Sequence, residues 1–246
     1  MTVRNVTKAE VLLTRNCNLS CQHCEVIGPE VQEMSPDQWR RAFDVVYDKL
    51  GATFVALYGG EPLSYSYGDD GLCEIFRHLA TKRSQQSDFT VISNSIGLTK
   101  QRAEKFMQAG VESWTASVDT LAKRPRLGSK HMNVKTRAGW AALNMFKEMG
   151  LRDTCGIVTI TPRNIGEVKD TIQALCDEGH WVGIDILHTK DRGDGEYSFG
   201  TALETMKEVN LAPLGKEHRE PMAELGLWIM DNYADLRVFP TKKVLG

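Results

Sequence analysis

Short apolar runs and amphipathic stretches alternate along most of the chain. The apolar runs are bounded by turn residues and are rich in Val, Ile, Thr and aromatic residues. They lie at Val11–Thr14, Thr53–Tyr58, Phe89–Ser93, Ser113–Val118, Gly156–Thr161 and Val182–Leu187. Nearly continuous apolar character is typical of strands that are covered on both faces, as in a parallel sheet. The pattern therefore predicts six buried strands.

The stretches between these runs carry apolar residues at spacings of three and four, which predicts helices. The clearest stripe runs from Trp39 to Leu50. Ser35 is suited to cap this helix, with Pro36 at the first helical position and Gln38 where a capping box needs Glu or Gln. A second helix is expected to begin at Asn164. Further helices are predicted around Gly71–Thr81, Ala103–Met107 and Trp140–Met149.

A glycine follows four of the helical patterns and precedes the next strand, at Gly51, Gly110, Gly150 and Gly179. Glycine just past a helix end tolerates the left-handed conformation that closes the last turn. The repeat of helix, glycine and strand predicts about six βα units over residues 1–188, in an α/β fold. Parallel strands with right-handed crossovers form either a doubly wound sheet or a partial barrel, and periodicity alone does not separate the two.

The pattern changes after Leu187. Residues 188–200 are polar and glycine-rich, which indicates a loop, and helices are predicted at Thr201–Asn210 and Glu217–Tyr233. We therefore expect a second region, residues 189–246, that forms a short and mainly helical C-terminal extension packed on the first.

Composition places the chain among ordinary globular proteins. Its 246 residues are 41% hydrophobic and 25% charged, with a net charge of −2. These values exclude a disordered or collagenous chain, and the near-neutral balance argues against nucleic-acid binding. We expect no secretory signal, because residues 1–10 lack an apolar run, and no run approaches the roughly 18 apolar residues of a membrane helix. We expect a cytoplasmic protein without membrane association.

Three of the six cysteines, Cys17, Cys21 and Cys24, lie together directly after the first strand. Active sites of parallel α/β folds collect at this carboxyl end of the strands. Three thiolates can bind one soft metal centre and leave a metal coordination position open, whereas a structural zinc site or an ordinary iron–sulfur cluster uses four ligands. A structural zinc with His23 as fourth ligand, or a cluster of free thiols, remains an alternative.

A second motif, Gly59-Gly60-Glu61-Pro62, follows the second strand. Two glycines let a ligand approach the backbone closely and leave amides free to bind it, and Glu61 adds a carboxylate at the same edge. Alone, the motif is explained by an ordinary βα turn. Beside the cysteine loop of the neighbouring strand, it favours a binding site.

The two motifs together resemble those of the radical S-adenosylmethionine (radical SAM) superfamily. The resemblance implies a partial (β/α)6, TIM-like barrel, in which Cys17, Cys21 and Cys24 hold three irons of a [4Fe–4S] cluster. SAM chelates the fourth iron, and Gly59–Pro62 lies at its amino group. An external one-electron reductant of the flavodoxin or ferredoxin type reduces the cluster, which cleaves SAM to methionine and a 5′-deoxyadenosyl radical. The radical then abstracts hydrogen from a substrate.

Other positions of the superfamily can be placed by the same resemblance. Ser93 and Asn94 resemble a Thr-Asn-Gly segment near SAM, although Ser95 stands in place of the glycine. Ser117 and Asp119 resemble a Ser-x-Asp segment near the carboxylate and ribose of SAM.

Two more positions lie further along the chain. Arg137 matches an arginine that pairs with the SAM carboxylate in some members, but it also fits an exposed surface residue. His188 follows the sixth strand near the expected adenine position, and it equally fits a loop residue without a role.

The cysteine motif has the form Cys-Asn-Leu-x-Cys-x-His-Cys, which is found in the SPASM and twitch branch, whose members often modify peptides and proteins. That branch needs further cysteines after the barrel, but none follows Cys176. The motif therefore favours a peptide or protein substrate, and the missing auxiliary cluster favours a small anionic metabolite, a sugar or a nucleotide. A non-catalytic zinc or iron–sulfur module of structural or regulatory function is the alternative.

The remaining cysteines, Cys73, Cys155 and Cys176, are expected to pack in the interior. Cys73 follows the glycine motif and is a weak candidate for a hydrogen-atom donor. The basic segment Lys123–His131 is either a solvated loop or an anion site at the barrel mouth. Nearby tyrosines, Tyr65 and Tyr67, could stack on a substrate.

Overall fold

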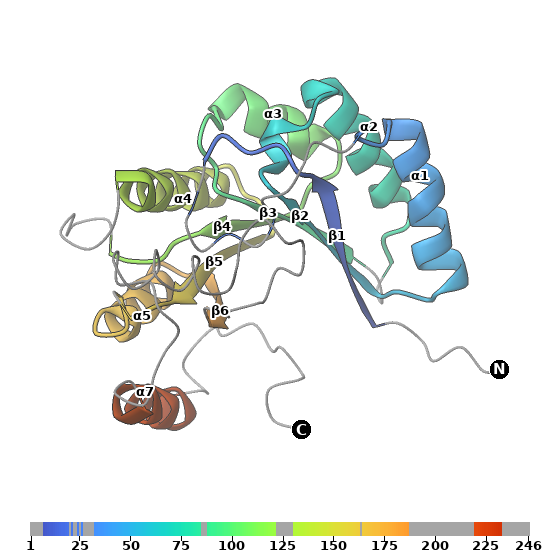
Figure 1. Cartoon of the computed structure of the whole chain (residues 1–246). Helices are drawn as coiled ribbons and strands as arrows, with labels where there is room; N and C mark the ends of the chain where they lie inside the picture. Colours follow the sequence, from blue (N-terminus) through green and yellow to red (C-terminus); the bar gives the residue numbers. More distant parts are fainter. Residues whose placement is uncertain are drawn as a thin grey trace, which may run out of the picture.

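The computed structural model describes residues 7–19, 21, 24, 26, 32–84, 88–121, 130–162, 164–186 and 219–232. Six parallel strands follow one another in the sheet in chain order (Figure 1). The strands are β1 Lys8–Thr14, β2 Phe54–Gly59, β3 Asp88–Ser93, β4 Ser113–Ser117, β5 Asp153–Ile160 and β6 Trp181–Ile186. All six predicted strands are confirmed, with ends that differ from the prediction by a few residues.

The helices lie between consecutive strands and cover one face of the sheet (Figure 1). They are α1 Pro36–Asp44, α2 Gly68–Thr81, α3 Lys100–Gln108, α4 Lys130–Glu148 and α5 Val168–Asp177, with α7 Arg219–Asn232 after the sheet. A doubly wound sheet reverses its strand order and places helices on both faces. The consecutive order found here instead matches an open, partial barrel, with β1 and β6 at its two edges.

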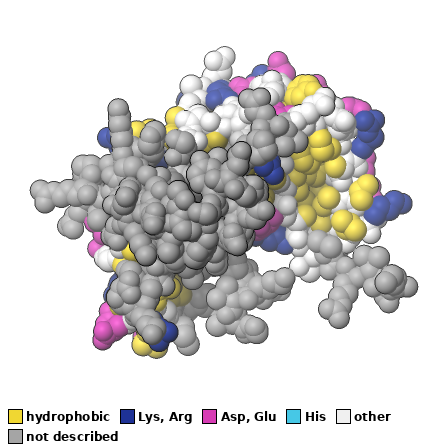
Figure 2. All heavy atoms as spheres, in the orientation of Figure 1, with side chains coloured by type: hydrophobic (Ala, Val, Ile, Leu, Met, Phe, Trp, Pro, Cys, Tyr) yellow, Lys and Arg dark blue, Asp and Glu magenta, His cyan; other side chains and the backbone are white. Residues whose placement is uncertain are grey.

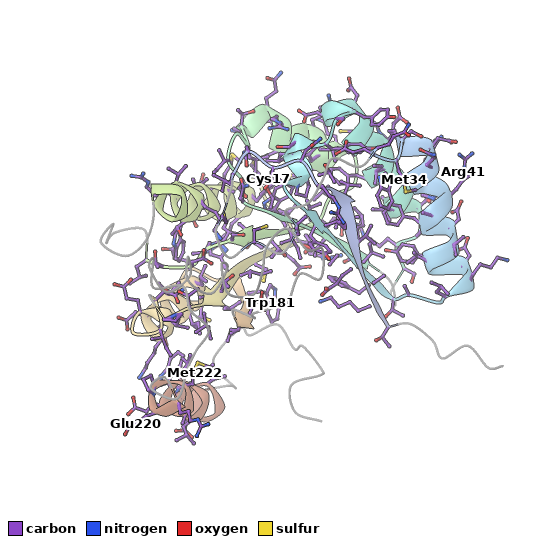
Figure 3. The ribbon with its side chains drawn as sticks, in the orientation of Figure 1. Cys17, Met34, Arg41, Trp181, Glu220 and Met222 are labelled. Carbon is purple, nitrogen blue, oxygen red and sulfur yellow. The ribbon has the colours of Figure 1, made fainter. Side chains whose placement is uncertain are left out.

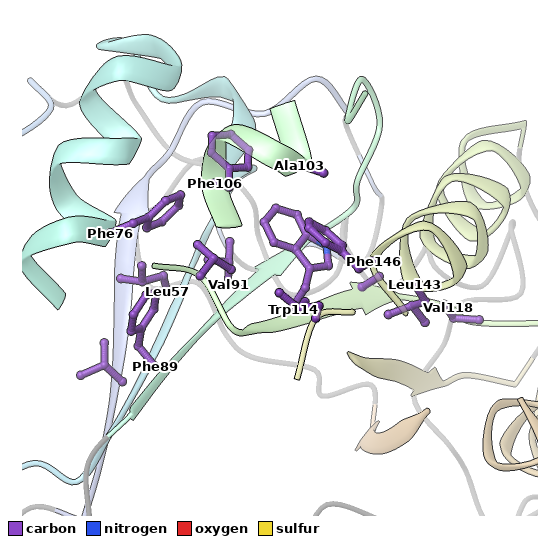
Figure 4. Packing of buried hydrophobic residues seen from close by; sticks show 14 of the residues in the cluster. Leu57, Phe76, Phe89, Val91, Ala103, Phe106, Trp114, Val118, Leu143 and Phe146 are labelled. Atoms are coloured by element: carbon purple, nitrogen blue, oxygen red, sulfur yellow. The ribbon is translucent and has the colours of Figure 1, made fainter. Parts of the chain in front are cut away.

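The main core lies between the sheet and its helices (Figure 4). The Trp114 ring of β4 packs between Phe106 of α3, at 6.2 Å between centroids, and Phe146 of α4, at 4.9 Å. Phe76 of α2 meets Phe106 edge-on at 5.5 Å. All four rings are fully buried. Aromatic contacts therefore join three helices to the middle of the sheet.

The signals for helix ends are confirmed. The Ser35 side chain accepts a hydrogen bond from the Gln38 amide, and the Gln38 side chain bonds back to the Ser35 amide at 2.8 Å. The last turn of this helical segment is a π-helix, Val45–Lys49. The glycines that end the helices have positive φ, for example 98° at Gly110, which explains their recurrence.

One predicted helix start is wrong. Helix α5 begins at Val168, not at Asn164, because the Asn164 side chain is used elsewhere. Its Nδ2 donates to the carbonyl oxygens of Asp119 at 2.7 Å and Thr159 at 2.8 Å, and its Oδ1 accepts from the Thr161 amide at 2.7 Å. This fully buried amide ties the ends of β4 and β5 together.

The C-terminal helix α7 packs on the barrel next to α5. Leu225 is buried, and the Lys169 ammonium of α5 lies 5.0 Å from the ring centroid of Trp228. The helix predicted at Glu217–Tyr233 is thereby confirmed, whereas Thr201–Asn210 and the loop 188–200 lie outside the described residues. The division at residue 188 stays a prediction.

The surface shows no membrane-spanning segment in the part of the chain that the structure describes. No helix there is both long and apolar enough to cross a bilayer. On the face seen in Figure 2, hydrophobic side chains gather over β1 and α1, and Lys and Arg side chains flank them.

The aromatic core yields a stability prediction. Phe146→Ala removes a fully buried ring from its contact with Trp114 and should lower the free energy of unfolding by about 3–5 kcal/mol. Leu227→Ala is the control, because Leu227 is 60% exposed, and it should change stability by less than about 0.5 kcal/mol. Urea titration of both variants measures the difference, and equal midpoints would contradict this view of the core.

Candidate functional site

The three clustered cysteines lie on the loop that leaves the carboxyl end of β1. Figure 3 shows Cys17 above the strand ends and Met34 where the chain returns to α1. Cys17 is exposed, Cys21 and Cys24 are half-buried, and all three are free thiols. The Leu19 amide donates to Cys17 Sγ and the Val26 amide to Cys24 Sγ, each at 3.4 Å. Such donors suit thiolate ligands because they stabilise negative charge on sulfur.

The electrostatics of the loop are mixed. Burial raises the pKa of Cys17 and Cys21 above the ordinary value, and the Lys135 ammonium partly offsets this at Cys21. Within the described ranges, no three His, Cys, Asp or Glu side chains converge closely enough to hold a metal ion. The donor set thus fits a soft metal centre in its chemistry, and the thiols still have to gather around it.

The glycine motif has a different physical role from the one its sequence suggests. A Cβ atom at Gly59 would lie 2.3 Å from the carbonyl oxygen of Thr14, and one at Gly60 would lie 2.4 Å from that of Asn16. The amides of Gly60 and Glu61 donate to those same two oxygens, both at 2.8 Å. The expectation that these two amides are free for a ligand is therefore wrong, because the start of the cysteine loop occupies them.

Glu61 is likewise committed to the protein. Its carboxylate is fully buried and accepts hydrogen bonds from the Leu63 amide at 3.0 Å, Ser93 Oγ at 2.7 Å and the Asn94 amide at 2.7 Å. Burial raises the pKa of Glu61, and these hydrogen bonds partly oppose that rise. The residue clamps the end of β2 to the end of β3, so its carboxylate is not a free ligand group; Pro62 follows it, buried, in a short 3₁₀ turn.

Ser93 and Asn94 complete the connection to the cysteine loop. Asn94 Nδ2 donates to Asn18 Oδ1 at 2.8 Å, and Asn18 Nδ2 donates to the carbonyl oxygen of Ile96 at 3.4 Å. Asn18 directly follows Cys17, so the segment after β3 holds the start of the cysteine loop in place. The structure thus brings the three sequence motifs after β1, β2 and β3 into one connected site.

Ser95, which stands where the resembled motif has a glycine, adopts a backbone conformation that favours glycine. Its φ is 60°, in the left-handed region, where it is the one non-glycine residue of the described chain. Its Oγ accepts a hydrogen bond from the buried Trp114 indole at 3.1 Å. The serine therefore costs backbone strain, but its hydroxyl gives the buried Trp114 indole a hydrogen-bond acceptor.

A buried ion pair lies on the other side of the site. Lys135 Nζ of α4 is 2.6 Å from Asp119 Oδ2, and both side chains are almost fully buried. Asp119 raises the pKa of Lys135 against the opposing effect of burial, and Cys21 and Cys24 add to the rise. Gly139, one turn further along α4, permits this approach, because a Cβ there would lie 2.4 Å from the carbonyl oxygen of Ser117.

Sequence reasoning missed Lys135 and chose Arg137, which is exposed on the same helix. The spacing of Lys135 and Gly139 by four residues was the available signal, since it places both on the helix face toward β4. Ser117 is half-buried at the end of β4. His188 and nearly all of the basic segment lie outside the described residues, so their assignments stay predictions.

Two weaker assignments are wrong. Cys73 lies on α2, is 1% exposed, and directs its thiol at the carbonyl oxygen of Lys105 on α3, so it does not face a substrate at the strand ends. Tyr65 is buried, and its hydroxyl donates to the carbonyl oxygen of Met34 at 2.6 Å, so its ring is not free to stack. Tyr67, beside it, is 49% exposed and retains that option.

Ser95 provides a test of the strained backbone. Ser95→Ala leaves the Trp114 indole without its partner and keeps the left-handed strain, which should cost about 1–3 kcal/mol. Ser95→Gly loses the same hydrogen bond but relieves the strain, so it should be more stable than the alanine variant by about 1 kcal/mol. Urea denaturation measures both, and an alanine variant at least as stable as the glycine variant would show that the backbone is unstrained.

Known proteins resemble this chain in sequence. The radical SAM superfamily model matches residues 11–175, from β1 nearly to the end of α5. A GTP 3′,8-cyclase of Mycobacterium sp. (strain KMS) is 26% identical over 249 residues, which cover 93% of this chain and 66% of that protein. One from Aquifex aeolicus is 29% identical over 210 residues, which cover 82% and 62%. The chain thus spans just under two thirds of the length of these relatives.

Solved structures share the fold. Streptococcus suis SuiB bound to S-adenosylmethionine aligns with a TM-score of 0.67 at 13% identity, over 95% of this chain and 49% of SuiB. The protein anSMEcpe with bound AdoMet aligns with a TM-score of 0.65 at 12% identity, over 96% and 61%. Enzymes of this superfamily use a [4Fe–4S] cluster and S-adenosylmethionine, and they require an electron donor and a substrate. The extent of the family match shows that this chain belongs to the radical SAM superfamily.

Proposed function

We propose that this chain is a radical SAM enzyme in which Cys17, Cys21 and Cys24 hold a [4Fe–4S] cluster. The observation that carries the proposal is the connected site itself. Three free thiols follow β1, and hydrogen bonds tie their loop to the motifs after β2 and β3. A structural zinc site is closed by four ligands and does not require connections to the motifs of two further strands. The catalytic role is therefore favoured over a non-catalytic one.

The division of work between cofactor and protein follows from the site. When bound, the reduced cluster supplies the electron that splits S-adenosylmethionine into methionine and a 5′-deoxyadenosyl radical, which takes hydrogen from the substrate. The protein binds, orients and shields these groups. Gly59, Gly60 and Glu61 fix the start of the cysteine loop, and the amides aimed at Cys17 and Cys24 stabilise thiolate charge.

We assign the S-adenosylmethionine site to the edge next to the cysteines. Gly59–Pro62 and Asn94 border it on one side and Ser117 and Asp119 on the other, with His188 proposed near the adenine. Lys135 is a cation buried beside Asp119, and its charge reaches Cys21. We therefore assign the SAM carboxylate to Lys135 in preference to the exposed Arg137, since a buried charge interacts more strongly than a solvated one.

The substrate proposal rests on sequence relatives. The proteins with 26% and 29% identity are named for a reaction of GTP, whereas SuiB, which one structure shows bound to a precursor peptide, shares only 12% and indicates the fold alone. We therefore favour a small anionic substrate of the nucleotide type over a peptide. A flavodoxin- or ferredoxin-type protein is the proposed electron donor, and a reducing compartment such as the cytoplasm keeps the thiols free.

Anaerobic reconstitution with iron and sulfide tests the enzyme proposal. The wild type should bind about four irons per chain and, after reduction with S-adenosylmethionine, release 5′-deoxyadenosine. Cys21→Ala should lose both properties. Cys176→Ala is the matched control, because Cys176 lies on α5 away from the loop, and it should retain both. A loaded wild type that forms no 5′-deoxyadenosine would refute the proposal, and full iron in Cys21→Ala would refute the ligand assignment.

The assignment of Lys135 has its own test. Lys135→Gln should raise the KM for S-adenosylmethionine by about tenfold or more, because a charge-assisted hydrogen bond contributes about 1.5–3 kcal/mol. Arg137→Gln should leave the KM nearly unchanged, since Arg137 is exposed. Iron content and circular dichroism establish that both variants are folded and loaded. The reverse order of effects would restore the original assignment to Arg137.

A further inference from the structure

The loop that carries the three cysteines is closed at its base by a single carboxylate. Glu33 stands at the end of this loop, two residues before the Ser35 cap of α1. Its Oε1 accepts hydrogen bonds from Thr14 Oγ1 and from Asn16 Nδ2, the latter at 3.0 Å. Thr14 is the last residue of β1 and Asn16 precedes Cys17. One side chain therefore joins the two ends of the loop.

The other carboxylate oxygen binds a third segment. Glu33 Oε2 accepts from the Ser66 amide at 2.8 Å, and Asn16 Nδ2 also donates to Ser66 Oγ at 3.1 Å. Ser66 lies in the connection between β2 and α2, just after the glycine motif. A neighbouring bond, from the Tyr65 hydroxyl to the Met34 carbonyl oxygen, fixes the same point of return. The base of the loop is thus bonded both to the end of β1 and to the connection between β2 and α2.

Loop closure has a direct consequence for cluster binding. The thiols do not converge in the structure, so binding has to gather them, and the entropic cost of gathering depends on how freely the loop moves. A loop whose ends are also joined by side-chain hydrogen bonds samples fewer arrangements than one held only by its connections to β1 and α1. Charge-assisted hydrogen bonds to a carboxylate are the strong kind, which suits them to this task.

We propose that Glu33 is a positioning residue that closes the cysteine loop and so favours retention of the cluster. The proposal rests on the proposed function of Cys17, Cys21 and Cys24 as ligands. Within the described residues, the hydrogen-bond partners of Glu33 are Thr14, Asn16 and Ser66, none of which is a reacting group. Glu33 is half-buried and does not belong to the hydrophobic core, so we expect the overall fold not to depend on it.

Three variants separate loop closure from general stability. Glu33→Ala removes all three hydrogen bonds. Glu33→Gln retains one carbonyl oxygen at the same position and should rescue part of the effect. Asp37→Asn is the matched control, because Asp37 is an exposed carboxylate four residues away whose partners, Arg40 and Arg41, lie within α1.

The first measurement is the rate at which reconstituted protein loses iron to a chelator such as bathophenanthroline disulfonate. Glu33→Ala should lose iron at least about fivefold faster than wild type, with Glu33→Gln between them and Asp37→Asn unchanged. Thermal unfolding of the cluster-free proteins should differ little among the four. Wild-type retention in Glu33→Ala, or an equal loss of cluster-free stability, would overturn the proposal.

The second measurement needs no cluster. In the cluster-free protein, alkylation of Cys21 and Cys24 by iodoacetamide, followed by mass spectrometry, should be about threefold faster or more in Glu33→Ala, because both thiols are half-buried and an open loop exposes them. Unchanged alkylation would refute loop closure even if the wild type binds four irons. If Glu33→Ala is alkylated faster but the wild type binds no iron, the proposed function is refuted and the role of Glu33 in the loop is kept.

Discussion

Backbone contact between the end of β1 and the end of β2 is the constraint on which the site depends. Side chains at Gly59 and Gly60 would lie 2.3 and 2.4 Å from the backbone oxygens of Thr14 and Asn16, closer than real Cβ atoms come. Only glycine lets the two segments meet, so that the amides of Gly60 and Glu61 donate two hydrogen bonds of 2.8 Å to the end of β1 and the start of its loop. The direction in which the cysteine loop leaves the sheet is therefore set by the absence of two methyl-sized groups, before any cofactor binds.

A buried carboxylate carries this constraint to the next strand. Glu61 loses its hydration inside the protein, which is costly, but three donors from the ends of β2 and β3 replace the lost water. Asn94 then continues the connection to Asn18, beside the first cysteine. Backbone and side-chain hydrogen bonds thus couple three strand ends, so a displacement at one of them would be felt at the cysteine loop. The site keeps its geometry only if every buried polar group in this network has a hydrogen-bond partner.

The sequence predicted the order of the elements well, because strand and helix periodicity, the Ser35 capping box and the helix-ending glycines are local signals. Periodicity alone did not give the strand order, since it is the same in a barrel and in a doubly wound sheet, but the resemblance of the motifs implied the partial barrel that the structure shows. The glycine motif was placed correctly but explained wrongly, because its partner is another segment of the chain. Lys135 and Glu33 were missed because their partners lie 16 or more residues away, and the spacing of Lys135 and Gly139 shows only a shared helix face, not what that face contacts.

The buried pair of Lys135 and Asp119 is better explained by binding than by stability. Burying two charges costs several kcal/mol per ion, and well-packed apolar residues often replace such pairs without loss, so the pair is weak support for a purely structural role. Its position argues for function, since the Lys135 ammonium interacts with Cys21 and Cys24 as well as with Asp119. Three thiolates gathered on the loop would add negative charge to this edge, and a buried cation would then be balanced by the site that it helps to form. The Lys135 ammonium lies beside the thiols of the cysteine loop, where its positive charge offsets theirs. The Glu33 carboxylate lies at the base of the same loop, where it accepts the hydrogen bonds that join the two ends of the loop.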